Sequence, residues 1–152
     1  MVNIRHAKIE DYEDVEKIMR QVQQMHIDWR PDLYKMGRIM FPYEMYLNAV
    51  EKHSFVVAEE EKKVVGFLFY EVIHIENDNQ VERNVLFVDS MGIEEMYRRR
   101  GIGHLLFDYV REMKKSGKID QIELQVNSMN QNARKMYEKY GFREKAVTME
   151  LK

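Results

Sequence analysis

A basic, glycine-containing segment in the second half of the chain has residue types that bind phosphate. It lies between an apolar strand pattern and a helical pattern, and reads Arg98-Arg99-Arg100-Gly101-Ile102-Gly103-His104. Glycine lets the backbone turn sharply, and the unpaired N–H groups at the start of a helix favour an anion. Arginine adds forked donors that match phosphate oxygens. The segment predicts a pyrophosphate-binding loop; the alternative is a plain helix start with solvated arginines.

Two widespread phosphate motifs do not fit this loop. The pair Gly101-x-Gly103 lacks the third glycine of a dinucleotide-binding fingerprint, because Leu106 occupies that position. The Gly-Lys-Ser/Thr sequence of a P-loop is also missing. The loop is therefore interpreted as a different type of phosphate site.

A second segment with candidate functional side chains lies closer to the C-terminus. Asn130 precedes a helical pattern, and Gly141 ends it. We expect the side-chain oxygen of Asn130 to cap this helix. Tyr137 shares a helix face with Ala133 and Met136. Taken alone, this position indicates a core aromatic residue whose hydroxyl is satisfied at the edge of the core.

Hydrophobic periodicity predicts the elements that would position these segments. A mixed sheet flanked by helices follows, which makes the chain an α/β protein. The run 64–75 is almost continuously apolar and predicts a central strand covered on both faces, joined to the next strand in a hairpin. Expected strands are 2–6, 54–58, 64–75, 81–93, 122–126 and 147–151, and expected helices are 12–25, a stretch between Pro31 and Pro42, 43–51, 102–113 and 130–140.

Composition limits the classes of function. The chain has 152 residues, no cysteine and a formal net charge of -2. We expect a single domain over residues 1–152, without disulfides, thiolate metal sites or a cysteine nucleophile.

The charge argues against nucleic-acid binding, and no apolar run reaches the roughly 18 residues of a membrane span. No secretory signal is visible, so a cytoplasmic location is expected. The histidines lack metal-ligand spacing, so no metal is expected.

Together, the glycine-containing segment at 98–104 and the helical segment that follows Asn130 resemble the GNAT superfamily of acyl-CoA-dependent N-acetyltransferases. The Gln/Arg-x-x-Gly-x-Gly/Ala motif of that family appears as residues 98–103. Its Asn-x-x-Ala-x-x-x-Tyr-Glu-Lys-x-Gly-Phe pattern appears as residues 130–142. The expected order of elements matches across nearly the whole chain. Residues 93–97 lack a proline that the family often has, which removes only a restraint on φ.

The resemblance implies that acetyl-CoA lies in a gap between two splayed strands of a mostly antiparallel sheet. The strand end Met91-Gly92-Ile93 would offer backbone groups to the pantetheine arm and the thioester carbonyl. The pyrophosphate would rest on N–H groups from Arg99 to His104, beside Arg98. Asn130 would contact the pantetheine, and Tyr137 would stand near the thioester sulfur.

Acetyl transfer to an amine needs a base, because a free lysine-like amine has a pKa near 10.4. We expect Asp89 to be this base, since its position locally resembles the glutamate of the spermidine/spermine acetyltransferase branch. Strict alternation would place it on one face with Phe87, Met91 and Ile93. Aspartate is shorter, so a relay water is an option. The alternatives are that Asp89 pairs with an arginine or caps a bulge, and Glu71 is the reserve base.

The remaining expectations concern the leaving group, the acceptor and the partners. The phenol of Tyr137 would protonate the departing thiolate. His26 and Trp29 follow the first helix pattern and would contact the amine; the alternative is a helix connection with Trp29 buried.

The acceptor class stays open among small amines, polyamines, aminoglycoside-like compounds and peptide amines. A non-catalytic CoA-binding sensor or partner subunit is the alternative function. An exposed edge strand near the C-terminus would support a homodimer.

Overall fold

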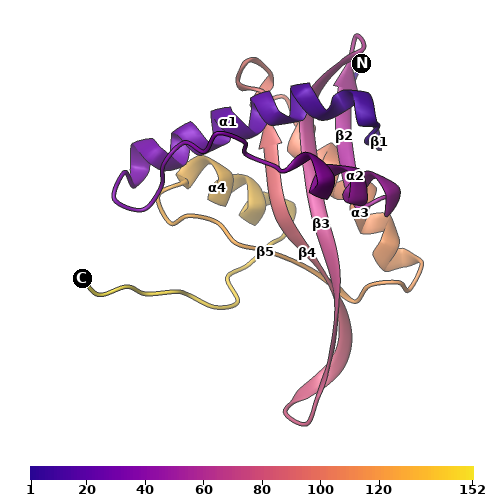
Figure 1. Cartoon of the computed structure of the whole chain (residues 1–152). Helices are drawn as coiled ribbons and strands as arrows, with labels where there is room; N and C mark the ends of the chain where they lie inside the picture. The colour runs from indigo at the N-terminus through magenta and orange to yellow at the C-terminus, as the bar shows by residue number, and fades with distance from the viewer.

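The computed structural model describes residues 1–152 and is built on one five-stranded sheet (Figure 1). The strands lie side by side in chain order. The first four pair antiparallel, and the fifth runs parallel to the fourth. The expected mixed, mostly antiparallel sheet is confirmed. Its strands are β1 (Asn3–His6), β2 (Phe55–Glu60), β3 (Lys63–Asn77), β4 (Gln80–Ile93) and β5 (Gln121–Leu124).

Helices cover both faces of this sheet. Side chains of α1 and α2 pack on one face, with Val15 and Tyr46 fully buried. Side chains of α3 pack on the other face, and α4 adds partly buried residues there. None of the helices is long and apolar enough to cross a membrane. The helices are α1 (Tyr12–Trp29), α2 (Tyr43–Glu51), α3 (Ile102–Lys115) and α4 (Gln131–Tyr140), with short 3-10 turns at Ile9–Asp11 and Glu95–Tyr97.

The central strand β3 serves both layers. Phe67 and Phe69 join the cluster below α1 and α2, whereas Leu68 and Tyr70 join the cluster below α3. This alternation fits the period of two in a strand. Burial on both faces is confirmed only as far as Tyr70, because the rest of the β3–β4 hairpin projects beyond the helices (Figure 1).

A β-bulge interrupts β4 at Asp89. Phe69 is opposite Ser90 and Tyr70 is opposite Val88, so Asp89 is the extra residue. An extra residue reverses the alternation of side chains beyond it. The expectation that Asp89 and Met91 share a face is therefore wrong. Met91 packs in the cluster below α3.

The sheet splays where β4 passes β5. The two strands pair only from Val85 to Val88, against Gln121 to Leu124. Beyond Val88 the edge of β4 that faces β5 has no partner strand. The gap between splayed strands that the family resemblance implied is confirmed.

Two expected elements are absent. Residues 31–42 form no helix, because the Glu16 carboxylate of α1 accepts the N–H groups of Met40 and Phe41 at 3.2 and 2.5 Å and holds that segment open. Residues 147–151 form no strand. An alternating pattern becomes a strand only where a sheet edge pairs with it, and no strand lies beside β5 on its outer side.

A glycine sets the distance between α1 and the end of β4. A Cβ at Gly92 would lie 2.9 Å from side-chain atoms of Phe67 and Val22 and 3.0 Å from one of Ile18. We expect Gly92→Ala to lower the free energy of unfolding by about 1–3 kcal/mol through overpacking. Urea unfolding followed by circular dichroism measures this. Ser90→Ala is the control, and equal midpoints for wild type and Gly92→Ala would contradict the close packing.

Candidate active site

The loop between β4 and α3 turns through left-handed backbone conformations. Arg99 has φ 64° and Gly101 has φ 80°, and Gly101 is the N-cap of α3. Glycine takes this conformation without steric cost. Arg99 does so at a cost of about 1–3 kcal/mol, and such strain concentrates at ligand-binding sites.

The backbone N–H groups of this loop form a run without partners. No N–H from Arg99 to His104 donates to an acceptor within the chain. The first helical bond of α3 is the one from the Leu105 N–H to the Gly101 carbonyl, at 3.2 Å. Consecutive free N–H groups at a helix start carry partial positive charge and suit an anion. The geometry fits the pyrophosphate site expected from the sequence.

The three arginines differ in their contacts. Arg98 is half-buried, and its Nε donates to the Ile93 carbonyl at 3.2 Å, so it closes the loop onto the end of β4. The guanidinium of Arg100 lies 4.9 Å from the centre of the Tyr97 ring. Arg99 Nη2 lies 3.5 Å from Asn132 Oδ1, at the start of α4. Arg99 and Arg100 are exposed and place positive charge beside the free N–H groups.

The second glycine of the motif has a packing role. Gly103 is buried, and a Cβ there would lie 3.0 Å from Met136 Cε and 3.1 Å from Met91 Cε. The absence of a side chain lets α4 and β4 approach the start of α3. His104 contacts the ring of Tyr140 edge-on at 5.2 Å.

The end of β4 presents backbone groups to the gap. The Glu94 N–H donates to the Val65 carbonyl beside β3 at 2.8 Å. Backbone direction alternates along an antiparallel strand, so Gly92 also faces β3. Met91 and Ile93 then face the edge that β5 leaves open. Of the three expected cofactor contacts on this strand, Met91 and Ile93 are directed into the gap and Gly92 is directed toward β3.

Asn130 and Tyr137 come from α4. Asn130 Oδ1 accepts the N–H of Ala133 at 3.2 Å, which confirms the expected helix cap. Tyr137 packs between the rings of Phe107 and Phe142, at 5.9 and 5.8 Å. The prediction that Tyr137 is a core aromatic residue is therefore confirmed for its ring.

The hydroxyl of Tyr137 makes no hydrogen bond within the chain, yet it is not sealed from solvent. The only fully enclosed side-chain nitrogen or oxygen that lacks a partner is Nδ1 of His26. Burial of the ring raises the pKa of Tyr137. The phenol therefore keeps its proton at neutral pH and is free to donate a hydrogen bond.

A cavity of about 220 Å³ lies between α1 and β4. It brings together two residues proposed from the sequence, Asp89 and His26. Met91 lines it as well and also reaches Gly103 at the loop, so this side chain connects the cavity with the gap. The lining residues are Met19, Val22, Gln23, His26, Met40, Phe41, Phe67, Asp89, Ser90 and Met91.

Asp89 and His26 have contrasting environments. Asp89 is exposed and forms no ion pair or hydrogen bond within the chain. Of its two alternatives, the arginine pair is not observed, and although a bulge lies at Asp89, the side chain does not cap it by a hydrogen bond. Burial lowers the pKa of His26, so its ring is neutral at pH 7. Trp29 and Tyr34 pack against that ring at 5.5 and 5.1 Å. Trp29 thus supports His26 and does not line the cavity, and the reserve base Glu71 does not line it either.

Sequence reasoning missed the connection between α1 and the loop. Gln21 Oε1 accepts the Glu95 N–H at 3.0 Å, and Gln21 Nε2 lies 3.4 Å from the carboxylate of Glu94. Glu94 is buried and caps the following turn by accepting the Met96 N–H at 2.7 Å. These residues are far apart in the sequence, so no local pattern indicates the contact.

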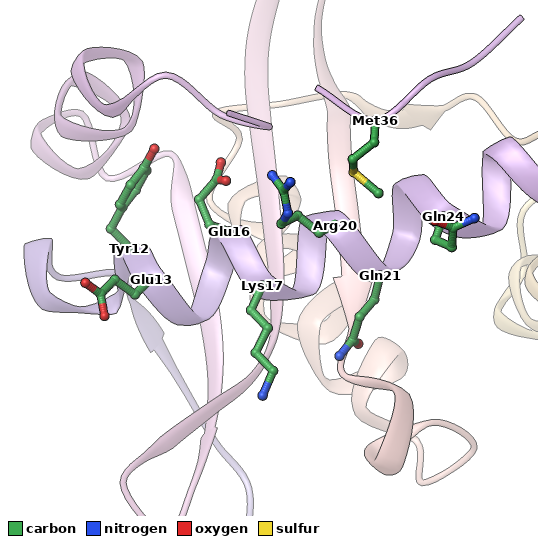
Figure 2. A pocket seen from close by; sticks show the side chains of 8 residues that line it. All are labelled: Tyr12, Glu13, Glu16, Lys17, Arg20, Gln21, Gln24 and Met36. Atoms are coloured by element: carbon green, nitrogen blue, oxygen red, sulfur yellow. The ribbon is translucent and has the colours of Figure 1, made fainter. Parts of the chain in front are cut away.

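A second hollow lies elsewhere, on the side of α1 that carries Glu13 and Lys17 (Figure 2). It has a volume of about 670 Å³ and is wide open. Glu16 and Arg20 in its wall already bind the backbone of residues 37–41. The hollow contains none of the proposed site residues.

One group of metal-binding residue types lies on the projecting hairpin. The ligand atoms of His74, Glu76 and Glu82 all lie within 4.8 Å of one another, and the three residues are exposed. Exposed acidic groups are common without an ion, and the expectation that the chain binds no metal stays a prediction.

Comparisons with known proteins agree with this geometry. Residues 17–142 match the family model described as Acetyltransferase (GNAT) family. The chain is 31% identical over 106 residues to the uncharacterized N-acetyltransferase YycN of Bacillus subtilis, covering 70% of this chain and 65% of YycN. The chain thus spans slightly less than two thirds of that relative's length.

Two solved structures are similar over nearly the whole chain. A mutant of the BH1408 protein from Bacillus halodurans has a TM-score of 0.91 at 26% identity, covering 99% of this chain and 98% of that chain. The aminoglycoside N-acetyltransferase AAC(6')-Iy in complex with CoA has a TM-score of 0.72 at 14% identity, with 99% and 98% covered, and shows the fold alone. Because the family match includes the loop, the splayed strands and α4, the chain belongs to the GNAT acetyltransferase family.

Proposed function

We propose that this chain transfers the acetyl group of acetyl-CoA to a primary amine. The observation that carries the proposal is the run of unpaired N–H groups from Arg99 to His104 beside the open edge of β4. Two phosphates joined to a long polar arm match that arrangement. YycN is named an N-acetyltransferase, and a structure with the same fold was solved in complex with CoA; both support this assignment.

In the proposed complex, the pyrophosphate of CoA binds the loop, with Arg99 and Arg100 adding charge. The pantetheine arm runs along the open edge of β4 and forms hydrogen bonds with Met91 and Ile93, in the manner of an added strand. The side-chain amide of Asn130 contacts the arm from α4. The thioester then reaches the part of the gap that Met91 connects with the cavity.

The amine enters the cavity beside Asp89. Asp89 removes a proton from it, directly or through a water molecule, and the neutral nitrogen attacks the thioester carbon. A C–N bond forms, the nitrogen of the adduct loses its second proton to water, and the C–S bond breaks to leave the neutral amide. A backbone N–H at the β4 edge binds the oxyanion, and one such donor is worth about 3–4 kcal/mol in a well-studied hydrolase. Tyr137 gives its proton to the departing thiolate. The chain has no cysteine, so direct transfer is proposed in place of an acyl-cysteine intermediate.

The cavity suits a slender acceptor. Most of its lining is apolar, and Asp89 is its one acidic group. A primary amine on a linear chain fits such a site, since the carboxylate pairs with the ammonium group before deprotonation. We propose a small-molecule or peptide amine as acceptor.

Binding and turnover together test the proposal. We expect calorimetry to detect CoA binding, and we expect thiol release from acetyl-CoA in the presence of at least one amine among a polyamine, an aminoglycoside and a peptide with a free N-terminus. CoA binding without thiol release for any amine would support a non-catalytic CoA-binding module. No CoA binding would contradict both functions.

Two glycines that flank α3, Gly101 before it and Gly117 after it, provide a matched pair for the phosphate loop. Gly101 and Gly117 both have left-handed φ values, 80° and 77°, and neither has an atom within 4 Å of an added Cβ. Alanine at either position costs about 1–2 kcal/mol of backbone strain. In the same calorimetric experiment, Gly101→Ala is expected to weaken CoA binding and Gly117→Ala is not.

Tyr137→Phe tests the proton donor. We expect kcat to fall by about 10²–10⁴-fold with little change in the KM for acetyl-CoA, because only the hydroxyl is lost. Burial raises the pKa of Tyr137 above its ordinary value of 10.0, so the phenol stays protonated up to about pH 10. Ionisation of Tyr137 should therefore cause no loss of wild-type kcat at any pH below about 10. Tyr140→Phe, on the same helix, is the control with full activity. An unchanged kcat in Tyr137→Phe would remove the acid role.

Asp89→Asn tests the base. We expect kcat/KM for the amine to fall by about 10²–10⁴-fold at pH 7 and to recover partly as pH rises, because more of the free amine is then neutral. Steady-state kinetics between pH 6 and 10 measures both effects. Glu71→Gln is expected to keep wild-type kinetics. A loss of kcat/KM in Glu71→Gln, together with wild-type kinetics in Asp89→Asn, would assign the base role to Glu71.

A further inference from the structure

One side chain of α1 connects the two parts of the proposed site. Gln21 forms hydrogen bonds with the turn at residues 94–97, which joins β4 to the phosphate loop: its Oε1 accepts the Glu95 N–H at 3.0 Å, and its Nε2 lies 3.4 Å from the Glu94 carboxylate. No other side chain of α1 hydrogen-bonds residues 94–104. In Figure 2, Gln21 extends from α1 on the side away from Glu16 and Met36. A single amide group therefore ties α1 to this turn.

The chemistry of the contact favours glutamine. The turn presents a donor and an acceptor side by side, the Glu95 N–H and the Glu94 carboxylate. A side-chain amide carries an acceptor and donors on one planar group, so Gln21 pairs with both at once. A glutamate at this position would bring two carboxylates together. A methionine, which has the same length, would leave both groups of the turn without this partner.

Other bonds hold the turn to the sheet and to the phosphate loop. Glu94 is buried, its N–H donates to the Val65 carbonyl at 2.8 Å, and its carboxylate accepts the Met96 N–H at 2.7 Å. On the loop side, Arg98 Nε donates to the Ile93 carbonyl at 3.2 Å. A phosphate bound to the N–H groups that follow would restrain the loop, and these bonds would pass the restraint on to the turn.

The turns of α1 on either side of Gln21 form one wall of the cavity. Gln21 itself does not line it. Val22 Cγ2 lies 2.9 Å from the position of a Cβ on Gly92, so α1 and β4 are in close contact next to the tie. A change in the position of α1 therefore changes the width of the cavity. The residues of α1 that line the cavity are Met19, Val22, Gln23 and His26.

We propose that Gln21 is a positioning residue that couples CoA binding at the phosphate loop to the cavity that receives the amine. The inference rests on the proposed function. CoA on the loop restrains the turn, Gln21 transmits the restraint to α1, and the α1 wall of the cavity becomes more ordered. The amine then meets a wall that has already lost its conformational freedom, so its binding costs less entropy. Linkage makes the effect reciprocal, and the amine strengthens CoA binding by the same factor.

Hydrogen–deuterium exchange of residues 19–26 tests the coupling with CoA alone as the probe. Gln21→Met keeps the length of the side chain and removes both hydrogen bonds. Gln24→Met is the matched control, because Gln24 is exposed and bonds only Asp28 of the same helix, at 2.9 Å. We expect saturating CoA to slow exchange by about 5-fold or more in the wild type and in Gln24→Met, and to leave it unchanged in Gln21→Met. Calorimetry should show that all three proteins bind CoA.

Each outcome of the exchange experiment decides the coupling. Free and CoA-bound forms of the same protein are compared, so a general loss of stability in a variant does not imitate the effect. A wild type that binds CoA without slower exchange in α1, or a Gln21→Met variant that keeps the slowing, would overturn the coupling and leave the proposed function intact. A wild type that does not bind CoA would contradict both.

Steady-state kinetics gives a second measurement, with the amine of the panel above that releases thiol fastest. At saturating acetyl-CoA, we expect Gln21→Met to raise the KM for this amine by about 5-fold or more with kcat close to that of the wild type. A merely structural defect would instead lower kcat, because less of the enzyme would be folded. Gln24→Met should keep both constants. An unchanged KM for the amine in Gln21→Met would overturn the coupling.

Discussion

Backbone hydrogen bonds that the chain leaves unmade where β4 meets α3 are the constraint on which the site depends. Most buried N–H and C=O groups in proteins are paired, because an unpaired one costs about as much as a lost hydrogen bond. Here two unpaired parts lie at either end of one short connection: the edge of β4 beyond Val88, which has no partner strand, and the N–H groups from Arg99 to His104. Only water or a polar, elongated ligand satisfies both. In the proposed function, the preference for a phosphate-bearing, strand-like ligand thus comes from the backbone more than from any side chain.

Side chains keep these two parts open. Met91 and Met136 fill the space above Gly103, which fixes the distance between β4, α3 and α4. Gln21 of α1 binds the backbone of Glu95, so the helix over the cavity is also attached to the start of the loop. The bulge at Asp89 then turns one carboxylate toward the cavity, and Met91 both lines that cavity and packs in the layer of α3. Splay, loop and cavity are therefore connected through direct contacts of these residues.

The parts of this arrangement that local sequence determines were predictable. The loop at 98–104 and the cap at Asn130 follow from residue types at fixed spacing, and the helices follow from apolar periodicity. The bulge at Asp89 was not predictable, because a register shift depends on the facing strand. The same holds for residues 31–42, where a distant carboxylate, that of Glu16, captures the backbone. The alternation at 147–151 predicted a strand that the structure does not have, because an alternating pattern becomes a strand only where a sheet edge pairs with it.

The positions of Asp89 and Tyr137 restrict how protons move in the proposed reaction. Asp89 lines the cavity on the α1 side of β4, and the Tyr137 ring packs in the layer of α3 and α4. The sheet separates base from acid, so a proton cannot pass directly from one to the other. Each group has to act on a different atom of the reacting pair, the amine nitrogen on one side and the thioester sulfur on the other. This arrangement works only if the thioester carbon lies in the gap between β4 and β5, because only there does the barrier between the two layers open. The proposed mechanism therefore requires the splay for the chemistry as well as for binding.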